Sequence, residues 1–179
     1  MVYVFLAEGF EEIEALAPVD ILRRGGIEVK TVGIGQRTVM GSHKIPVLCD
    51  ISEDKVNLSD IDAVILPGGM PGTLNLEKSS TVQGAIDFAY KNGKLICAIC
   101  AAPSILGKKG LLKDKKAVCY DGFQKYLIGA EVQNSPAVLD GNIITACGAG
   151  AAYDFGFLIL SVLKDNKTAD ELRLSMKYK

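Results

Sequence analysis

The alternation of short apolar segments with segments of helical spacing is the feature that most constrains the fold. Strands are expected at residues 2–7, 28–33, 61–66, 95–99, 116–120 and 142–147. Helices are expected at residues 11–24, 81–90, 102–107, 151–163 and 169–176. Such alternation indicates an α/β fold with a mostly parallel sheet covered by helices on both faces. In this type of fold, functional residues gather at the carboxyl ends of the strands.

Size and charge narrow the class of protein further. The 179 residues are expected to form a single domain over positions 1–179, with an ordinary globular composition of 49% hydrophobic and 23% charged residues. The net charge of −1 creates no field that would attract nucleic acid or a membrane surface. The apolar start at residues 1–7 lacks a basic leader, and no apolar run reaches about 18 residues. We therefore expect no signal peptide, membrane segment or specific nucleic-acid partner.

The five cysteines do not follow the spacing of a disulfide framework, so reduced thiols in a cytoplasmic protein are expected. Cys97, Cys119 and Cys147 are expected to be small core residues, and Cys49 to be more exposed. Cys97 and Cys100 form a C-x-x-C pair, but Cys97 falls inside a predicted strand, which disfavours a thioredoxin-like redox motif. Because no second ligand pair completes a zinc site, neither a metal nor a cofactor is expected.

Cys100 is the strongest candidate for a functional residue. It lies where the strand predicted at residues 95–99 meets small residues and Pro103, which begin the next predicted helix. Helix N–H groups point near a sulfur at such a corner, so the position is expected to favour the thiolate. The arrangement is similar to the nucleophile elbow of hydrolases. It indicates either a cysteine-dependent enzyme or a thiol sensor.

Backbone donors for an oxyanion are expected at the same end of the sheet. Gly68 and Gly69 follow the strand predicted at residues 61–66, and glycine permits the backbone angles that turn an N–H inward. The N–H of Ala101, at the start of the next helix, is the natural second donor. A plain strand-terminal turn is the alternative interpretation of the two glycines.

The segment from Glu11 to Glu14 is the source of a carboxyl group. Glu11 and Glu12 are expected to face solvent at the helix start, where negative charge suits the helix dipole. Spacing alone also favours an exposed charge for Glu14. If Glu14 turned towards the end of the sheet, burial would raise its pKa, and it could exchange a proton with the sulfur.

Two other motifs have a structural interpretation. His43, the only histidine, lies in a short β excursion predicted at residues 39–49 and is expected to be a surface residue. Because no histidine follows Cys100, amide hydrolysis by a Cys–His–Glu triad is disfavoured. Gly148 and Gly150 begin like a dinucleotide-binding fingerprint, but the third glycine is missing, so a packing turn is favoured.

Five motifs, taken in order, resemble the ThiJ/PfpI superfamily and, within it, the Parkinsonism-associated deglycase (DJ-one) branch. They are residues 7–14 (AEGFEEIE), 18–20 (PVD), 23–25 (RRG), 66–69 (LPGG) and 98–103 (AICAAP), and the similarity continues through residues 148–150 and 154–155. The resemblance implies a flavodoxin-like (class I glutamine amidotransferase-like) three-layer sandwich. It also implies a homodimer, with Arg24 near the dimer interface.

Site residues follow from the same resemblance. It implies that Cys100 is the easily oxidised nucleophile, that Glu14 is its protonated partner, and that Gly69 and Ala101 supply the oxyanion-hole amides.

Substrate contacts are expected from three further residues, Gly68, Tyr120 and Gly148. Tyr120 stands where some members of the superfamily have a histidine.

The activity implied by the resemblance is the cofactor-free conversion of methylglyoxal to lactate, or the deglycation of proteins and nucleotides. Cys100 would attack as a thiolate and Glu14 would act as the acid and base. The substrate would be a small aldehyde or a glycated molecule. The alternative is a non-catalytic oxidative-stress sensor or redox chaperone that signals through oxidation of Cys100. A role in thiazole phosphate synthesis for thiamine, or amidase or protease activity, is less favoured by the residues.

Overall fold

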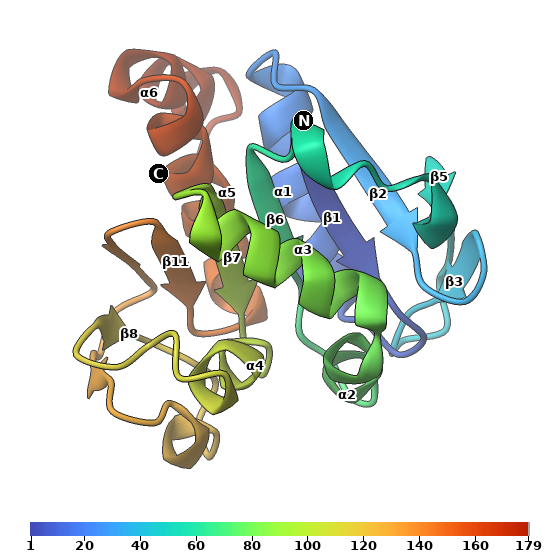
Figure 1. Ribbon diagram of the computed structural model, residues 1–179. Helices are drawn as coiled ribbons and strands as arrows, with labels where there is room; N and C mark the ends of the chain where they lie inside the picture. Colours follow the sequence, from blue (N-terminus) through green and yellow to red (C-terminus); the bar gives the residue numbers. More distant parts are fainter. Residues whose placement is uncertain (179) are drawn as a thin grey trace.

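A seven-stranded sheet forms the centre of the computed structural model, which describes residues 1–178 (Figure 1). The strand order is β10-β11-β7-β6-β1-β2-β5. The strands are β1 (Val2–Leu6), β2 (Val29–Gly33), β5 (Ile51–Ser52), β6 (Ala63–Leu66), β7 (Leu95–Ile99), β10 (Ala137–Asp140) and β11 (Ile143–Ala146). All neighbours pair in parallel except β10 and β11, which are antiparallel. The expectation of a mostly parallel sheet is confirmed.

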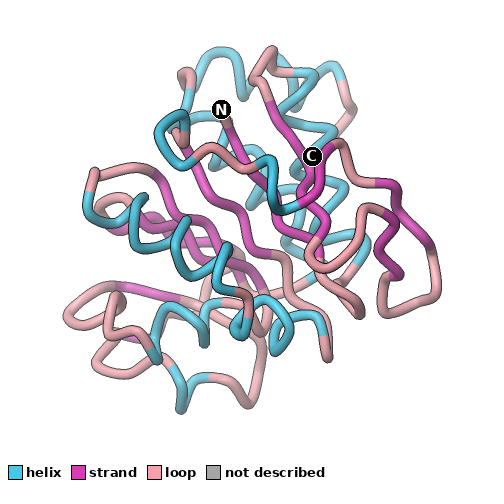
Figure 2. Tube along the Cα trace, turned by 45° about the vertical axis from the view of Figure 1, so that its right-hand side comes forward, coloured by secondary structure: helices cyan, strands magenta, loops and turns pink. Residues whose placement is uncertain are grey.

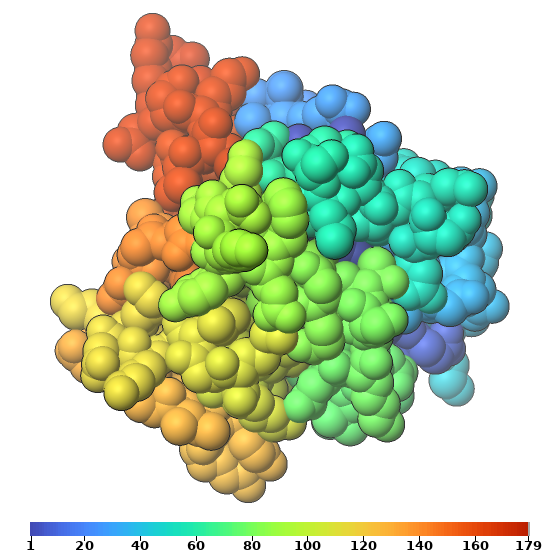
Figure 3. Space-filling model, in the orientation of Figure 1, coloured from blue at the N-terminus to red at the C-terminus, as the bar shows by residue number. Residues whose placement is uncertain are grey.

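Helices cover both faces of this sheet and complete the predicted three-layer sandwich (Figures 1 and 2). One face carries α1 (Glu12–Arg24), α5 (Ala152–Leu163) and α6 (Asn166–Ser175). The other face carries α2 (Gly72–Lys78), α3 (Ser80–Lys91) and α4 (Pro103–Lys108). Atoms of the α2–α4 region cover most of the sheet on that side (Figure 3).

Side chains alternate between two buried apolar clusters, one on each face. In β1, Val4 and Leu6 pack in the cluster beneath α1 and α5, whereas Tyr3 and Phe5 pack beneath α3. A parallel sheet buried on both faces needs strands that are apolar at every position, which explains their continuous hydrophobic runs.

The outer helices on the first face pack closely because small residues lie at the contact. A Cβ placed on Gly156 of α5 would lie 2.7 Å from Ile21 Cδ1 and 3.2 Å from Pro18 Cα, both in α1. The α1 helix runs without interruption from Glu12 to Arg24, with Pro18 inside it. This close contact fixes the position of α1, which carries the carboxyl groups of the candidate site.

Two short pairs of strands lie outside the main sheet. β3 (Thr38–Met40) and β4 (Pro46–Leu48) pair antiparallel, as the predicted β excursion requires. β8 (Lys116–Ala117) pairs with β9 (Glu131–Val132), so the strand predicted at residues 116–120 begins where expected but is shorter than predicted. After Ala117 the backbone no longer pairs as a strand, because Val118 N donates to Thr145 Oγ1 (2.9 Å) and Tyr120 N donates to Cys100 O (2.8 Å).

Several short elements were not expected from the sequence, namely α2, β5, β9, β10 and the 3₁₀ turns η1 (Glu53–Lys55), η2 (Leu58–Asp60), η3 (Gln124–Tyr126) and η4 (Ala149–Ala151). Short segments give too little periodicity to be recognised. Within residues 1–178, each helix is too short or too polar to span a bilayer.

Candidate functional site

Cys100 lies at the corner between β7 and α4, as expected. Its φ angle is 65°, in the left-handed region that residues other than glycine seldom adopt. Two backbone hydrogen bonds hold it there. Cys100 N donates to Ala146 O (2.9 Å), and Tyr120 N donates to Cys100 O (2.8 Å). Strained backbone held by its surroundings is common at functional sites.

Glu14 points from α1 towards this corner and is buried, with 1% of its surface exposed. Its Oε2 accepts a hydrogen bond from Gly68 N (2.9 Å), and its carboxyl lies close enough to the Cys100 thiol for each group to shift the pKa of the other. The structure thus brings together residues from the first helix, the β6 end and the β7 end. The exposed position that spacing alone favoured for Glu14 is wrong.

Burial raises the pKa of Glu14 to about 7, and the charge of Glu11 acts in the same direction. The hydrogen bonds from Cys100 and Gly68 lower it but do not cancel the effect of burial. A carboxyl with a pKa of about 7 exists in both protonation states at neutral pH, which is the property that a proton carrier needs.

The pKa of the Cys100 thiol is raised, contrary to the expectation that its position favours the thiolate. Burial raises its pKa to about 12, and the charge of Glu14 and the hydrogen bond to it add to the rise. The backbone amides of Ala101 and Gly69 lower the pKa because donors stabilise a thiolate. Their effect is smaller than that of burial beside a carboxylate, so the helix start alone does not ionise this sulfur.

Gly68 and Gly69, which follow β6, must be glycines because neighbouring atoms of the site occupy the space that a side chain would need. A Cβ on Gly68 would lie 2.6 Å from Cys100 Cβ and 2.7 Å from Glu14 Oε2. Gly69 has a φ angle of 87°, and a Cβ there would lie 2.5 Å from Glu11 N. The amides of Gly69 and Ala101 both act on the sulfur and lower the pKa of Cys100.

Tyr120 and Gly148 lie side by side at the wall of a surface cleft of about 1000 Å³. A Cβ on Gly148 would lie 3.2 Å from Tyr120 Cδ2, so only a glycine lets the ring approach this closely. Cys119, Cys147 and Asp154 also line the cleft. Cys100 is not among the residues that line the cleft; Tyr120 links the two places, because it borders the cleft and its N donates to Cys100 O (2.8 Å).

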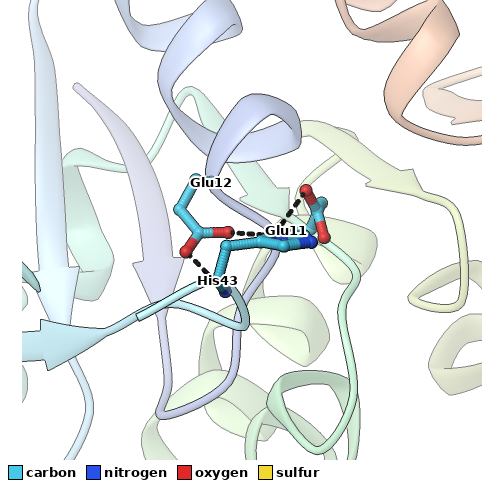
Figure 4. Close-up of side chains that lie close together, drawn as sticks. All are labelled: Glu11, Glu12 and His43. Carbon is cyan, nitrogen blue, oxygen red and sulfur yellow. Dashed lines mark hydrogen bonds and ion pairs between the residues drawn. The ribbon is translucent and has the colours of Figure 1, made fainter. Parts of the chain in front are cut away.

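The expectation that Glu12 faces solvent at the helix start is wrong, because Glu12 is only 5% exposed. Its Oε1 accepts from His43 N (2.8 Å), and its Oε2 lies 3.0 Å from His43 Nδ1 and 3.2 Å from Ser42 Oγ (Figure 4). His43 itself is exposed, as predicted. Burial raises the pKa of Glu12, but the hydrogen bonds from His43 outweigh it and lower the pKa overall.

The Glu12–His43 contact joins α1 to the loop between β3 and β4, a pairing that no spacing in the sequence reveals. Among the described residues, Glu11, Glu12 and His43 are also the cluster whose ligand atoms lie close enough for one metal ion, within 4.8 Å of one another. The hydrogen bonds between His43 and Glu12, and the 3.5 Å contact of His43 Nδ1 with Glu11 Oε1, account for this arrangement.

The remaining cysteines divide by burial. Cys49 is fully buried, contrary to the expectation of exposure, and burial raises its pKa to about 11. It packs in the core because Cys49 N donates to Arg37 O (2.7 Å), which draws the chain after β4 inward. Cys97 is buried inside β7, and Cys119 is 4% exposed. Cys147 is half-buried at the cleft rather than a core residue.

A comparison with family models matches residues 1–162 to the model described as the DJ-1/PfpI family. The match spans β1 through most of α5 and includes the corner, the two glycines and the α1 carboxyl.

Individual relatives agree with this match. The Drosophila melanogaster protein dj-1beta is 36% identical over 172 residues, which cover 94% of this chain and 92% of the relative. The Pyrococcus furiosus protein named deglycase PfpI is 32% identical over 163 residues, 88% of this chain and 96% of the relative. A crystal structure of a DJ-1 superfamily protein from Salmonella typhimurium superposes with a TM-score of 0.93 at 36% identity, covering 99% of this chain and 98% of the other.

Proposed function

Because this chain belongs to the DJ-1/PfpI family, we propose that it is a cofactor-independent, cysteine-dependent enzyme that acts on reactive carbonyls. The close approach of the buried carboxyl of Glu14 to the thiol of Cys100, on either side of Gly68, carries the proposal. It pairs a nucleophile with an acid that titrates near neutral pH. The name deglycase of an archaeal relative supports an enzymatic role.

The reaction begins with the proton of the Cys100 thiol. Water is a poor acceptor for it, since the pKa of this thiol is about 12. Glu14 is the better acceptor, because it lies against the sulfur and its pKa is about 7. Once Glu14 is neutral, its charge no longer opposes the thiolate, and the amides of Ala101 and Gly69 stabilise the ionised sulfur.

The thiolate then attacks the aldehyde carbon of methylglyoxal and forms a C–S bond. The carbonyl oxygen takes up the proton and gives a hemithioacetal. Glu14 removes the proton from this carbon while the ketone oxygen takes up a proton, which gives an enediol. Glu14 then returns its proton to the neighbouring carbon as the hydroxyl of the sulfur-bearing carbon loses its own, which gives a lactoyl thioester. Water hydrolyses the thioester, releases lactate and restores the thiol. One water is consumed, and no electrons leave the substrate.

The backbone donors serve the oxygen that becomes negative in these steps. Ala101 N and Gly69 N approach the sulfur from the α4 and β6 sides. Fixed amides aimed at a developing oxyanion can contribute about 3–4 kcal/mol to lowering a barrier. Tyr120 and Gly148 border the cleft from which an aldehyde or glycated group would arrive.

Lactate formation from methylglyoxal tests this proposal. We expect the wild type to form lactate, and Cys100→Ser and Glu14→Gln to lose at least about 100-fold in kcat/KM, as removal of a nucleophile or general base does. Cys97→Ala is the matched control, because this neighbouring cysteine is buried inside β7 away from the site and should remain active.

A wild type that forms no lactate but gains two oxygens selectively at Cys100 on peroxide treatment would contradict the enzyme proposal. That outcome would favour the alternative function, an oxidative-stress sensor or redox chaperone.

Two further properties belong to the proposal. We propose that the protein acts as a homodimer, with α1 contributing to the interface through exposed Ile13 and Leu16. We also propose a reducing, cytoplasmic environment, which fits the five cysteines that are free in the described chain.

A further inference from the structure

Two segments that hold the backbone of Cys100 each carry another cysteine. Cys100 N donates to the carbonyl of Ala146, the residue before Cys147, and Cys100 O accepts from the amide of Tyr120, the residue after Cys119. Cys119 and Cys147 both line the cleft of about 1000 Å³ beside this corner. Three cysteines from distant parts of the sequence therefore lie near the carboxyl ends of β7 and β11.

Cys147 is the better placed of the two neighbours. Ile99 and Ala146, the last residues of β7 and β11, are partners in the parallel register, and Cys100 and Cys147 directly follow them. Cys147 N donates to Pro136 O (3.0 Å), so its backbone continues the pairing of β11 with β10. Neighbouring strands lie about 4.8 Å apart, within the Cα separation of about 4.4–6.8 Å that disulfides span.

Exposure separates the candidates in the same way. Cys100 and Cys147 are both half-buried, whereas Cys119 is 4% exposed and Cys97 is fully buried. Cys100 and Cys147 are therefore accessible to a small oxidant, and Cys147 also borders the cleft. Gly148 follows Cys147 directly and gives the chain room to adjust, since glycine has little steric restriction.

We propose that Cys147 is a resolving thiol for Cys100, and that the two form a reversible disulfide when the protein meets a hydroperoxide. The proposal rests on the proposed function in one respect, the assignment of Cys100 as the reactive thiol.

The chemistry proceeds in two balanced steps. The Cys100 thiolate attacks one oxygen of hydrogen peroxide, the O–O bond breaks, and a sulfenic acid and hydroxide form. The sulfur of Cys147 then attacks the sulfenic sulfur, an S–S bond forms, and the hydroxyl leaves as water with the proton of Cys147. Peroxide is reduced to two waters overall, and the two thiols are oxidised to one disulfide.

This disulfide would protect the nucleophile. A sulfenic acid that is not resolved reacts with more peroxide to give a sulfinic acid, which is in general irreversible. A disulfide is reopened by small thiols. The pair would thus convert a permanent loss of the active sulfur into a temporary one.

Peptide mapping tests the proposal, because trypsin separates the three cysteines. After treatment of the reduced protein with hydrogen peroxide and alkylation of free thiols, digestion places Cys100 in residues 95–108, Cys119 in 117–125 and Cys147 in 126–164. We expect a cross-link between the first and third peptides that disappears on reduction, with fragment ions assigning it to Cys100 rather than to Cys97 of the same peptide. Cys147→Ser should lose this cross-link and gain two oxygens at Cys100. Cys119→Ser, the matched control, should keep it.

A wild type in which Cys100 becomes sulfinic without any cross-link, or becomes linked to residues 117–125, would overturn the proposal. Lactate formation by each variant before peroxide, measured on the same preparations, reports on the proposed function separately. With activity normalised to each untreated variant, dithiothreitol should restore the peroxide-treated wild type but not Cys147→Ser.

Discussion

At the scale of single residues, the site depends on one proton shared between a buried carboxyl and a thiol. Burial raises the pKa of both Glu14 and Cys100, so neither group ionises as readily as it would in water. Gly68 makes the contact possible, since it leaves the space between the two side chains open and donates its N–H to Glu14 Oε2.

Replacing Gly68 with alanine should separate the pair. The new Cβ would lie 2.6 Å from Cys100 Cβ and 2.7 Å from Glu14 Oε2, so one of these groups must move. We expect destabilisation of about 1–3 kcal/mol, as overpacking produces, and a loss of lactate formation. Denaturant unfolding and initial rates measure the two effects.

Gly84→Ala in α3 is the matched control for this change. Nothing lies within 4 Å of its Cβ position, so it should leave activity unchanged and stabilise the helix by roughly 0.5–1 kcal/mol. Equal activity in Gly68→Ala and the wild type would show that the contact does not matter for turnover.

At the scale of elements, α1 is the part that the site depends on most. It carries Glu14 and is held from two sides, by the packing of α5 at Gly156 and by the hydrogen bonds between Glu12 and the loop at His43. The position of Glu14 in the site therefore depends on how closely α1 packs against α5.

Gly156→Ala should show this coupling. The added methyl would meet Ile21 Cδ1 at 2.7 Å and Pro18 Cα at 3.2 Å, which outweighs the helix propensity that alanine gains. We expect a net loss of about 1 kcal/mol in the free energy of unfolding, together with a lower kcat for lactate formation. Gly84→Ala, where nothing lies within 4 Å and which is far in sequence from the cleft residues, should leave kcat unchanged. A normal kcat in a destabilised Gly156→Ala variant would show that the packing of α1 against α5 does not affect the site.

At the scale of the whole molecule, the exposed apolar residues of α1 give the proposed dimer a place. Ile13 is 53% exposed and Leu16 is 36% exposed, on the same helix that carries Glu14. Association through this helix would bury both side chains and restrain α1 at the same time.

Ile13→Glu should therefore shift the protein from dimer to monomer in sedimentation velocity, because a charge at an apolar contact must be desolvated. Leu174→Glu is the control on α6, where a 74% exposed leucine lies away from α1 and the change should leave the assembly intact. A monomeric wild type at micromolar concentration, or a dimer unaffected by Ile13→Glu, would contradict the proposed interface.

The alternation of apolar strands with helices in the sequence is enough to determine the layers of this protein, because hydrophobic periodicity is a local property of the chain. The same is true of Cys100, whose place after a strand and before small residues and Pro103 predicts a corner. Short elements such as α2 and β10 could not be predicted, since they depend on what the chain packs against.

Only the tertiary structure decided whether the carboxyl groups of Glu12 and Glu14 are exposed or buried. Glu12 and Glu14 are neighbours in a charged segment that reads as solvent-facing, yet both are buried. One meets a loop 31 residues away and the other meets Gly68, 54 residues away. Whether a carboxylate is exposed or desolvated, and hence its pKa, is set by such distant partners, and spacing along the chain does not contain them.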